Sequence, residues 1–435
     1  MTREREVELI ELLKNEVKPA LGCTEPIAVA LAVAKAAETI KDKGEVVNKI
    51  DVCVSANILK NGMGVGVPGT GMVGLHIAAA LGDTCGRSKY KLEVLKELND
   101  HAISKAKQML NENKVSVNLS SSSKKLYVSA TCSSINHTAT AVIEDNHDNI
   151  TTVSANGEII FQNGGDLNDN KENNNNSKRI LDYKLDIKTI HKFSTTVPIE
   201  DILFILNSVT LNKALAIEGL SNDYGLKVGK TIIDSNNAEI FGKGLLTYSM
   251  ALTAAASDAR MAGSTLPAMS NSGSGNQGIT VTIPVIAFAE KLGSSEESLT
   301  RALVLSHLIA IHIKGYLGKL SALCGCVIAS TGASCGIVYL KGGNLDQMEY
   351  AIKNMIGNIT GMVCDGAKVG CALKVASGVS SAVQSSILAL DNICISQNDG
   401  IIEKDIEKTI QNLGKIGSLG MQNTDNMILE IMVSK

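Results

Sequence analysis

The spacing of apolar residues predicts two helices at the start of the chain. Val7, Ile10 and Leu13 recur every three or four positions, which is the period of an amphipathic helix. A proline and a glycine then interrupt the pattern, and an Ala- and Val-rich run follows at residues 27–37. We expect residues 1–44 to form two helices, the second buried on most sides, that pack against the C-terminal helical domain.

The next part of the chain alternates between apolar and polar side chains in several short runs, a pattern typical of strands. We expect strands at residues 50–54, 115–119, 126–132, 138–143 and 149–153, with a further strand near residues 157–161. Helical spacing in the same region predicts helices at residues 75–81 and 91–109. Residues 45–162 should therefore form a smaller α+β domain.

From residue 185 to residue 435 the pattern is helical, and several segments are apolar nearly all round. Helices of that kind must be surrounded by other helices. We expect them at residues 199–212, 237–261, 280–292, 297–317, 345–362 and 377–390. The predicted fold class is α+β, with a large, mostly helical domain and a smaller inserted α/β sandwich-type domain. The Asn-rich residues 163–180 are too polar to bury apolar surface and should form a mobile loop.

Composition excludes several classes of protein. The net charge is −3 and no basic stripe is present, so nucleic acid is not an expected partner. The charged N-terminus does not resemble a signal peptide, and no apolar run is convincing as a membrane span. We therefore expect a cytoplasmic protein without a membrane partner, and the many apolar helices suggest a homo-oligomer. Cytoplasmic thiols stay reduced, so the ten cysteines are candidates for metal ligation, catalysis or inert burial.

Two cysteines, Cys364 and Cys371, enclose the sequence Asp-Gly-Ala-Lys-Val-Gly. Their spacing matches no standard zinc or ferredoxin pattern, so burial in the core remains open beside metal ligation. On a straight helix the two positions would be about 10 Å apart. If both thiols bind one centre, the segment should be a glycine-bent turn. Cys324 and Cys326, with one glycine between them, offer two further thiols.

Two other segments carry candidate chemistry. Cys23 precedes the second predicted helix, which Thr24 could cap, and a helix N-terminus lowers a thiol pKa and favours the thiolate. Residues 271–278, Asn-Ser-Gly-Ser-Gly-Asn-Gln-Gly, precede another predicted helix and suit a carboxylate or phosphate, although a flexible surface loop is an equal alternative. His307 and His312 lie five residues apart on an apolar helix, so we interpret them as packed side chains.

Five motifs together resemble one family. They are VKPALGCTEPIAVALA, SANILKNGMGVGVPGTG, SGSGNQGITVTIPV, LSALCGCVIASTGASCG and GNITGMVCDGAKVGCALKVASG. In this order they are similar to the L-cysteine desulfidase family, which is related to the iron–sulfur L-serine dehydratases. The resemblance runs from residue 17 to about residue 378, and the Asn-rich stretch falls outside it.

The resemblance implies an oxygen-sensitive [4Fe-4S] lyase of cysteine catabolism that converts L-cysteine to pyruvate, ammonia and hydrogen sulfide. Carried over by motif, the cluster ligands are Cys324, Cys364 and Cys371, and the open fourth iron acts as a Lewis acid. Cys326 is the rival of Cys324 for the first position. The motif Cys-Thr-Glu-Pro supplies Cys23 as the base that removes the Cα proton.

Five residues are our candidates for holding the amino-acid substrate. Ser272, Ser274 and Asn276 would bind its carboxylate, and Lys60 and Asn61 would contribute from the smaller domain. Three alternatives stay open: an iron–sulfur L-serine dehydratase with the same cofactor, a non-catalytic iron–sulfur sensor, and a helical protein that binds a small anion.

Overall fold

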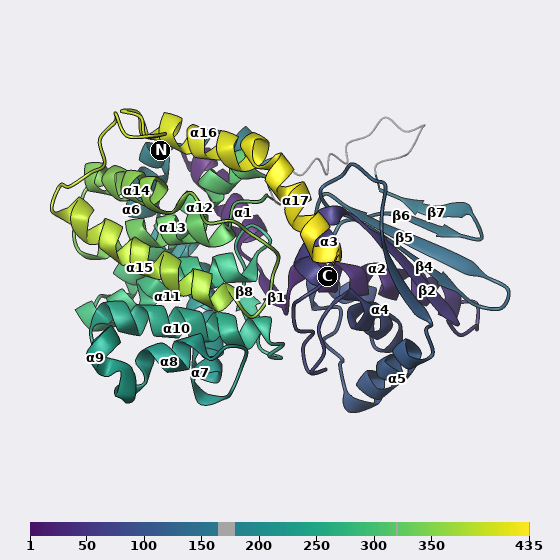
Figure 1. Ribbon diagram of the computed structural model, residues 1–435. Helices are drawn as coiled ribbons and strands as arrows, with labels where there is room; N and C mark the ends of the chain where they lie inside the picture. The colour runs from purple at the N-terminus through teal and green to yellow at the C-terminus, as the bar shows by residue number, and fades with distance from the viewer. Residues whose placement is uncertain (164–178, 319–320, 435) are drawn as a thin grey trace.

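The structure is a computed structural model that describes residues 1–163, 179–318 and 321–434. A large helical lobe lies beside a smaller lobe built on one sheet (Figure 1). The fold is therefore mostly helical α+β, as the sequence predicts. The expected mobile loop at residues 163–180 lies almost entirely outside the described residues.

The smaller lobe contains a six-stranded sheet in the order β3-β2-β4-β5-β6-β7. Its strands are β2 (Lys49–Val54), β3 (Val115–Leu119), β4 (Tyr127–Ser133), β5 (Thr138–Glu144), β6 (Ile150–Ala155) and β7 (Glu158–Gln162). All six lie within two residues of the predicted strands. The first two pair in parallel and the other neighbours are antiparallel. Alternation sets the buried face: Val128, Ala130 and Cys132 of β4 are buried, and the residues between them are half-exposed.

Helices cover one face of this sheet (Figure 1). They are α2 (Thr24–Lys41), α4 (Leu75–Thr84) and α5 (Asp100–Asn111), and the short α3 (Ala56–Gly62) lies beside them. Our expectation for residues 1–44 is wrong for α2, which packs against α4 and β4 of the smaller lobe. Its small apolar side chains allow that close contact, and a Cβ at Gly82 of α4 would lie 2.5 Å from the backbone oxygen of Ala30. By contrast α1 (Arg3–Glu16) packs in the helical lobe.

The helical lobe is layered around α13 (Gly325–Leu340), which contacts four neighbouring helices. These neighbours are α11 (Gly275–Leu292), α12 (Glu296–Leu317), α14 (Leu345–Ile359) and α15 (Cys371–Leu390). The lobe also contains α6 (Ile187–Thr196), α7 (Asn207–Ser221), α8 (Val228–Ile233), α9 (Ala238–Phe241), α10 (Leu245–Met261) and α16 (Ile406–Lys415). Two helical stretches, Leu203–Ser221 and Cys371–Leu390, are long and apolar enough to cross a membrane by composition alone. The second of these is α15, which packs against α10, α13 and α14 as a core helix does.

Three predicted helices are divided into shorter segments, and the individual helices α3, α6, α8, α13 and α16 were not predicted. The expected helix at residues 91–109 is a 3₁₀ segment (Ser88–Glu93) followed by α5, because Asn99 caps a new helix. The expected helix at residues 237–261 is broken between α9 and α10 at Gly242, whose φ is +75°. The expected helix at residues 199–212 is two short 3₁₀ segments followed by α7. No prediction was made for α17 (Gln422–Val433), which runs from the helical lobe to α3 of the smaller lobe (Figure 1).

A short antiparallel ladder joins segments that are far apart in the chain. β1 (Pro19–Leu21) pairs with β8 (Pro267–Met269), and each leads directly into one of the motifs identified above. Cys23 follows β1, and the loop at residues 271–274 follows β8. Backbone bonds continue the contact, because the N–H of Ser270 donates to the carbonyl of Lys18. The ladder therefore fixes the start of α2 beside the start of α11.

Candidate active site

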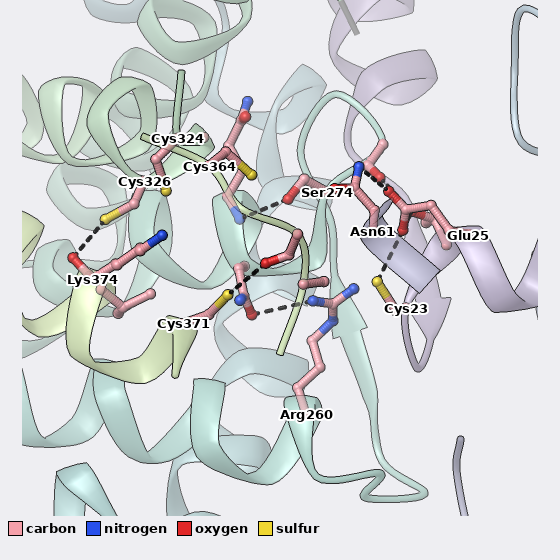
Figure 2. A pocket seen from close by; sticks show the side chains of 18 residues that line it. Cys23, Glu25, Asn61, Arg260, Ser274, Cys324, Cys326, Cys364, Cys371 and Lys374 are labelled. Carbon is pink, nitrogen blue, oxygen red and sulfur yellow. Dashed lines mark hydrogen bonds between the residues drawn. The ribbon is translucent and has the colours of Figure 1, made fainter. Parts of the chain in front are cut away.

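One cavity of about 110 Å³ lies where the two lobes meet. Its lining comes from the starts of α2, α11, α13 and α15, from the ends of α10 and α3, and from the loops that precede α11 and α15. All four candidate metal-binding cysteines reach it, and so does Cys23 (Figure 2). Segments separated by several hundred residues thus place five thiols around one space.

Two backbone contacts bring Cys324 and Cys364 together. An antiparallel bridge pairs Leu323 with Val363. The N–H of Cys324 donates to the carbonyl of Met362 (3.0 Å), and the N–H of Cys364 donates to the carbonyl of Ala322 (2.6 Å). The two cysteines therefore flank the same isolated bridge, one on each of the two bridged segments.

The segment between Cys364 and Cys371 is a bent loop, which confirms the predicted turn. Gly366 has a φ of +91°, a conformation that a side chain would strain, and α15 begins only at Cys371. Asp365 forms ion pairs with Lys368 and Lys374, which hold the loop against α15. The loop turns the second thiol back toward the first.

The thiols of Cys324 and Cys326 differ in their contacts. The Sγ of Cys326 donates to the carbonyl of Lys374 (3.1 Å), and a Cβ at Gly378 would lie 2.4 Å from that sulfur. Cys326 therefore fills the contact between α13 and α15. Cys324 stands at the N-cap of α13 without a side-chain capping bond. Burial raises the pKa of both thiols, to about 12 for Cys326 and well above its usual value for Cys324, where the neighbouring thiols add to the effect.

Cys23 does not have the lowered pKa that its position before a helix suggests. It occupies the N-cap position of α2 without a side-chain capping bond, and its Sγ–H donates to the Oε2 of Glu25 at 2.9 Å (Figure 2). Burial is the largest cause of its raised pKa, and the carboxylate of Glu25 raises it further. The sequence-based expectation of a thiolate here is therefore wrong, because desolvation outweighs the helix dipole.

The carboxylate of Glu25 is buried but well satisfied. Its Oε2 accepts from Cys23 and from Thr24 Oγ1 (3.2 Å), and its Oε1 accepts from Asn61 Nδ2 (3.1 Å). The Nε2 of His147, from the turn between β5 and β6, lies 4.0 Å from Oε1. Burial opposes ionisation, yet His147 and these hydrogen bonds hold the pKa of Glu25 below its usual value. Glu25 is thus a carboxylate beside a protonated thiol.

Three of the five substrate-binding candidates reach the cavity, namely Asn61, Ser274 and Asn276. Lys60 does not, because its buried ammonium group pairs with Asp425 of α17. Ser272 does not either, because its hydroxyl donates to the side chain of Asn271 (2.9 Å). Ser274 is also the N-cap of α11, because its Oγ accepts a hydrogen bond from the N–H of Gln277.

Sequence reasoning missed several lining residues, among them Glu25, Arg260, Gln277 and Lys374. Glu25 belongs to the Cys-Thr-Glu-Pro motif, in which only the cysteine was predicted to act. Arg260 carried one usable signal: it is the only charged residue besides Asp258 in a long apolar run of α10. As predicted, His307 and His312 are packed side chains, bonded to Asn271 and Glu407 respectively.

Positive side chains accompany the thiols. The buried ammonium of Lys314 and the half-buried one of Lys374 both interact electrostatically with Cys324 and Cys364. Burial lowers the pKa of Lys314 to about 8, and the neighbouring thiols oppose that shift. In the part of the chain that the structure describes, no three His, Cys, Asp or Glu side chains converge closely enough to hold a single metal ion.

Comparison with known proteins places this arrangement in a family. The model of the family "Serine dehydratase alpha chain" matches residues 89–430. A "UPF0597 protein" of Phocaeicola vulgatus is 48% identical over 435 residues, which cover 99% of this chain and 98% of the relative. Another, of Oleidesulfovibrio alaskensis, is 50% identical over 426 residues, which cover 98% of this chain and 97% of the relative. The chain belongs to the serine dehydratase alpha chain family.

Proposed function

We propose that this protein is an iron–sulfur lyase that removes the β-substituent of a small L-amino acid. The proposed substrate is L-cysteine, and the products are pyruvate, ammonia and hydrogen sulfide. The observation that carries the proposal is one cavity lined by the Cys23–Glu25 pair and by the thiols of Cys324, Cys364 and Cys371. A proton acceptor thus faces a set of soft metal ligands.

The donor set fits an iron–sulfur cluster better than a single ion. The thiols are spread around a cavity instead of converging on one point, and in a cluster separate irons take separate thiolates. Cys324, Cys364 and Cys371 would hold the group, and Lys314 and Lys374 would offset its thiolate charge. When bound, such a cluster with one open iron supplies Lewis-acid activation of the leaving group.

The Cys23–Glu25 pair accounts for removal of the Cα proton. The thiol is protonated at rest, so its proton must first pass along the 2.9 Å hydrogen bond to Glu25. The resulting thiolate accepts the Cα proton, the Cα electron pair forms the Cα–Cβ double bond, and the Cβ–S bond breaks. The leaving HS⁻ takes the proton held by Glu25 and departs as hydrogen sulfide, which restores the carboxylate. The aminoacrylate product tautomerises to an imine, and water hydrolyses it to pyruvate and ammonia.

L-serine dehydration is the second candidate, and the family match favours it. The same residues would act in both reactions, because the two substrates differ only in the β-heteroatom that leaves. The test is to incubate anaerobically purified protein with L-cysteine and with L-serine, and to measure pyruvate and sulfide. We expect equal amounts of pyruvate and sulfide from L-cysteine, formed faster than pyruvate from L-serine.

A faster reaction with L-serine would make the protein a dehydratase, and no pyruvate from either substrate would refute the elimination. The variants C23A and E25Q should keep the iron content of the wild type and lose at least about 10²-fold in turnover. C335A is the matched control, because Cys335 is a buried core thiol bonded to the carbonyl of Met348, away from the cavity. Loss of iron from C23A would make Cys23 a ligand instead of a base.

A further inference from the structure

Arg260 is a buried cation at the cavity with incomplete bonding. It lies in the last turn of α10, it is only 3% exposed, and it lines the cavity. Its Nη1 donates to the Oδ1 of Asn276 (3.2 Å), but its Nε has no hydrogen-bond partner. Among the described residues no carboxylate forms an ion pair with it. A buried guanidinium without a counter-ion is costly, so the position is explained best by an anion that arrives from outside.

The start of α11 adds a second positive feature at the same place. The guanidinium lies against Gly275, the first residue of this 18-residue helix, and a Cβ there would lie 2.2 Å from Nε. Only glycine allows the side chain to pack so closely. A helix N-terminus carries a partial positive charge, so the guanidinium and the helix both favour the same anion.

The neighbouring acid does not already fill this role. Glu25 is close enough for Arg260 to lower its pKa, but its oxygens accept from Cys23, Thr24 and Asn61. Figure 2 shows the guanidinium between Cys371 on one side and the Cys23–Glu25 pair on the other. An anion bound here therefore lies between the proposed base and the proposed ligands.

We infer that Arg260 and the N-terminus of α11 form a carboxylate subsite that binds the α-carboxylate of a small amino acid. The inference rests on the proposed function for the identity of the ligand. Guanidinium groups bind carboxylates through charge-assisted hydrogen bonds, and the free Nε is a donor for one of them. Asn276 accepts a hydrogen bond from Nη1 of Arg260 and lines the same cavity. The loop at residues 271–278 therefore positions the arginine.

The test measures binding without turnover. L-Alanine carries the carboxylate but has no β-substituent to eliminate, and L-alaninamide lacks the carboxylate. Calorimetric titration of the anaerobic holoprotein should show binding of L-alanine and at least tenfold weaker binding of L-alaninamide. R260Q and G275A should each weaken L-alanine binding at least tenfold, and R260K should recover part of the loss. G244A is the control, because Gly244 precedes α10 at the end away from Arg260 and a Cβ there meets nothing within 4 Å.

The possible contrary results distinguish a failure of the carboxylate subsite from a failure of the proposed elimination. Equal binding of L-alanine and L-alaninamide, or unchanged L-alanine binding by both R260Q and G275A, would overturn the subsite. Loss of iron from R260Q would assign the guanidinium to the thiolate centre and would also overturn it. Absence of pyruvate formation by the wild type, with Arg260-dependent L-alanine binding intact, would refute the proposed elimination and leave the subsite standing.

Discussion

At the scale of single residues, the contacts of Cys324 and Cys326 distinguish their roles, because both thiols are buried. Cys324 and Cys326 are two positions apart, and both line the cavity, yet only Cys326 is held by the α13–α15 contact through the carbonyl of Lys374 and the close approach of Gly378. Cys324 flanks the bridge that also carries Cys364. These contacts favour Cys324 as the ligand and assign Cys326 to packing.

Exchange of each cysteine for alanine tests that assignment. C324A should lose most of its iron and its visible absorbance after anaerobic purification, because one of three ligands is gone. C326A should retain both and lose only about 1–2 kcal/mol of unfolding free energy, since a small buried side chain is trimmed. Iron content and absorbance spectra check the pair, and the reverse pattern would make Cys326 the ligand.

At the scale of helices, one buried acid links α8 to α10. Asp258 of α10 is 1% exposed, and its Oδ2 accepts from the N–H of Gly229 in the first turn of α8 (3.0 Å). Burial raises its pKa from 3.8 to about 6, against the effect of the backbone hydrogen bonds. The folded protein thus retains a proton that the unfolded chain has lost.

This difference predicts a pH-dependent stability with a definite sign. Between about pH 4 and pH 6 the folded state binds more protons, so the free energy of unfolding should fall as pH rises and level off above about pH 6. D258N should remove this fall, which is of the order of 1–3 kcal/mol. Urea unfolding at several pH values measures it. D223N is the control, because the exposed Asp223 has its pKa lowered to about 2 by two lysines and should leave this pH window unchanged.

At the scale of the whole molecule, α17 ties the two lobes together. Asp425 of α17 pairs with the buried ammonium of Lys60 and accepts from Asn57 Nδ2 (2.8 Å), both on α3. The backbone oxygen of Lys60 in turn lies 2.3 Å from where a Cβ of Gly366 would be, in the cysteine loop. A salt bridge across the lobes therefore supports the wall of the cavity.

Removing only one partner of the Lys60–Asp425 ion pair should lower the free energy of unfolding more than replacing both partners with apolar side chains. D425A leaves the charge of Lys60 buried without a partner, so we expect a loss of about 2–4 kcal/mol of unfolding free energy, whereas the double variant K60M/D425L should lose less. Urea unfolding of both variants makes the comparison. E430A, at an exposed position of the same helix, should behave like the wild type. A double variant less stable than D425A would contradict the expectation.

The homo-oligomer expected from the sequence stays a prediction, which sedimentation analysis would test.

The sequence by itself determined the features that depend on near neighbours. Period-two alternation located six strands, helical spacing located most helices, and the glycines between Cys364 and Cys371 predicted the bent loop. These predictions succeed because strand faces, helix faces and turns are set by residues a few positions apart. The motifs also predicted Cys23 as the base and Cys324, Cys364 and Cys371 as ligands. The structure brings these four thiols to one cavity, and their roles stay predictions.

Only the tertiary structure decided how those residues are paired and solvated. Thr24 Oγ1 lies 3.0 Å from the carbonyl oxygen of Gly273, 249 positions away, and Lys60 pairs with Asp425 across 365 positions. No local pattern encodes such contacts, so the sequence could not reveal that Cys23 would be a desolvated thiol beside Glu25. Nor could it show α2 in the smaller lobe or the unpartnered Nε of Arg260. The energy of a buried charge depends on everything packed around it, and that environment exists only in the folded chain.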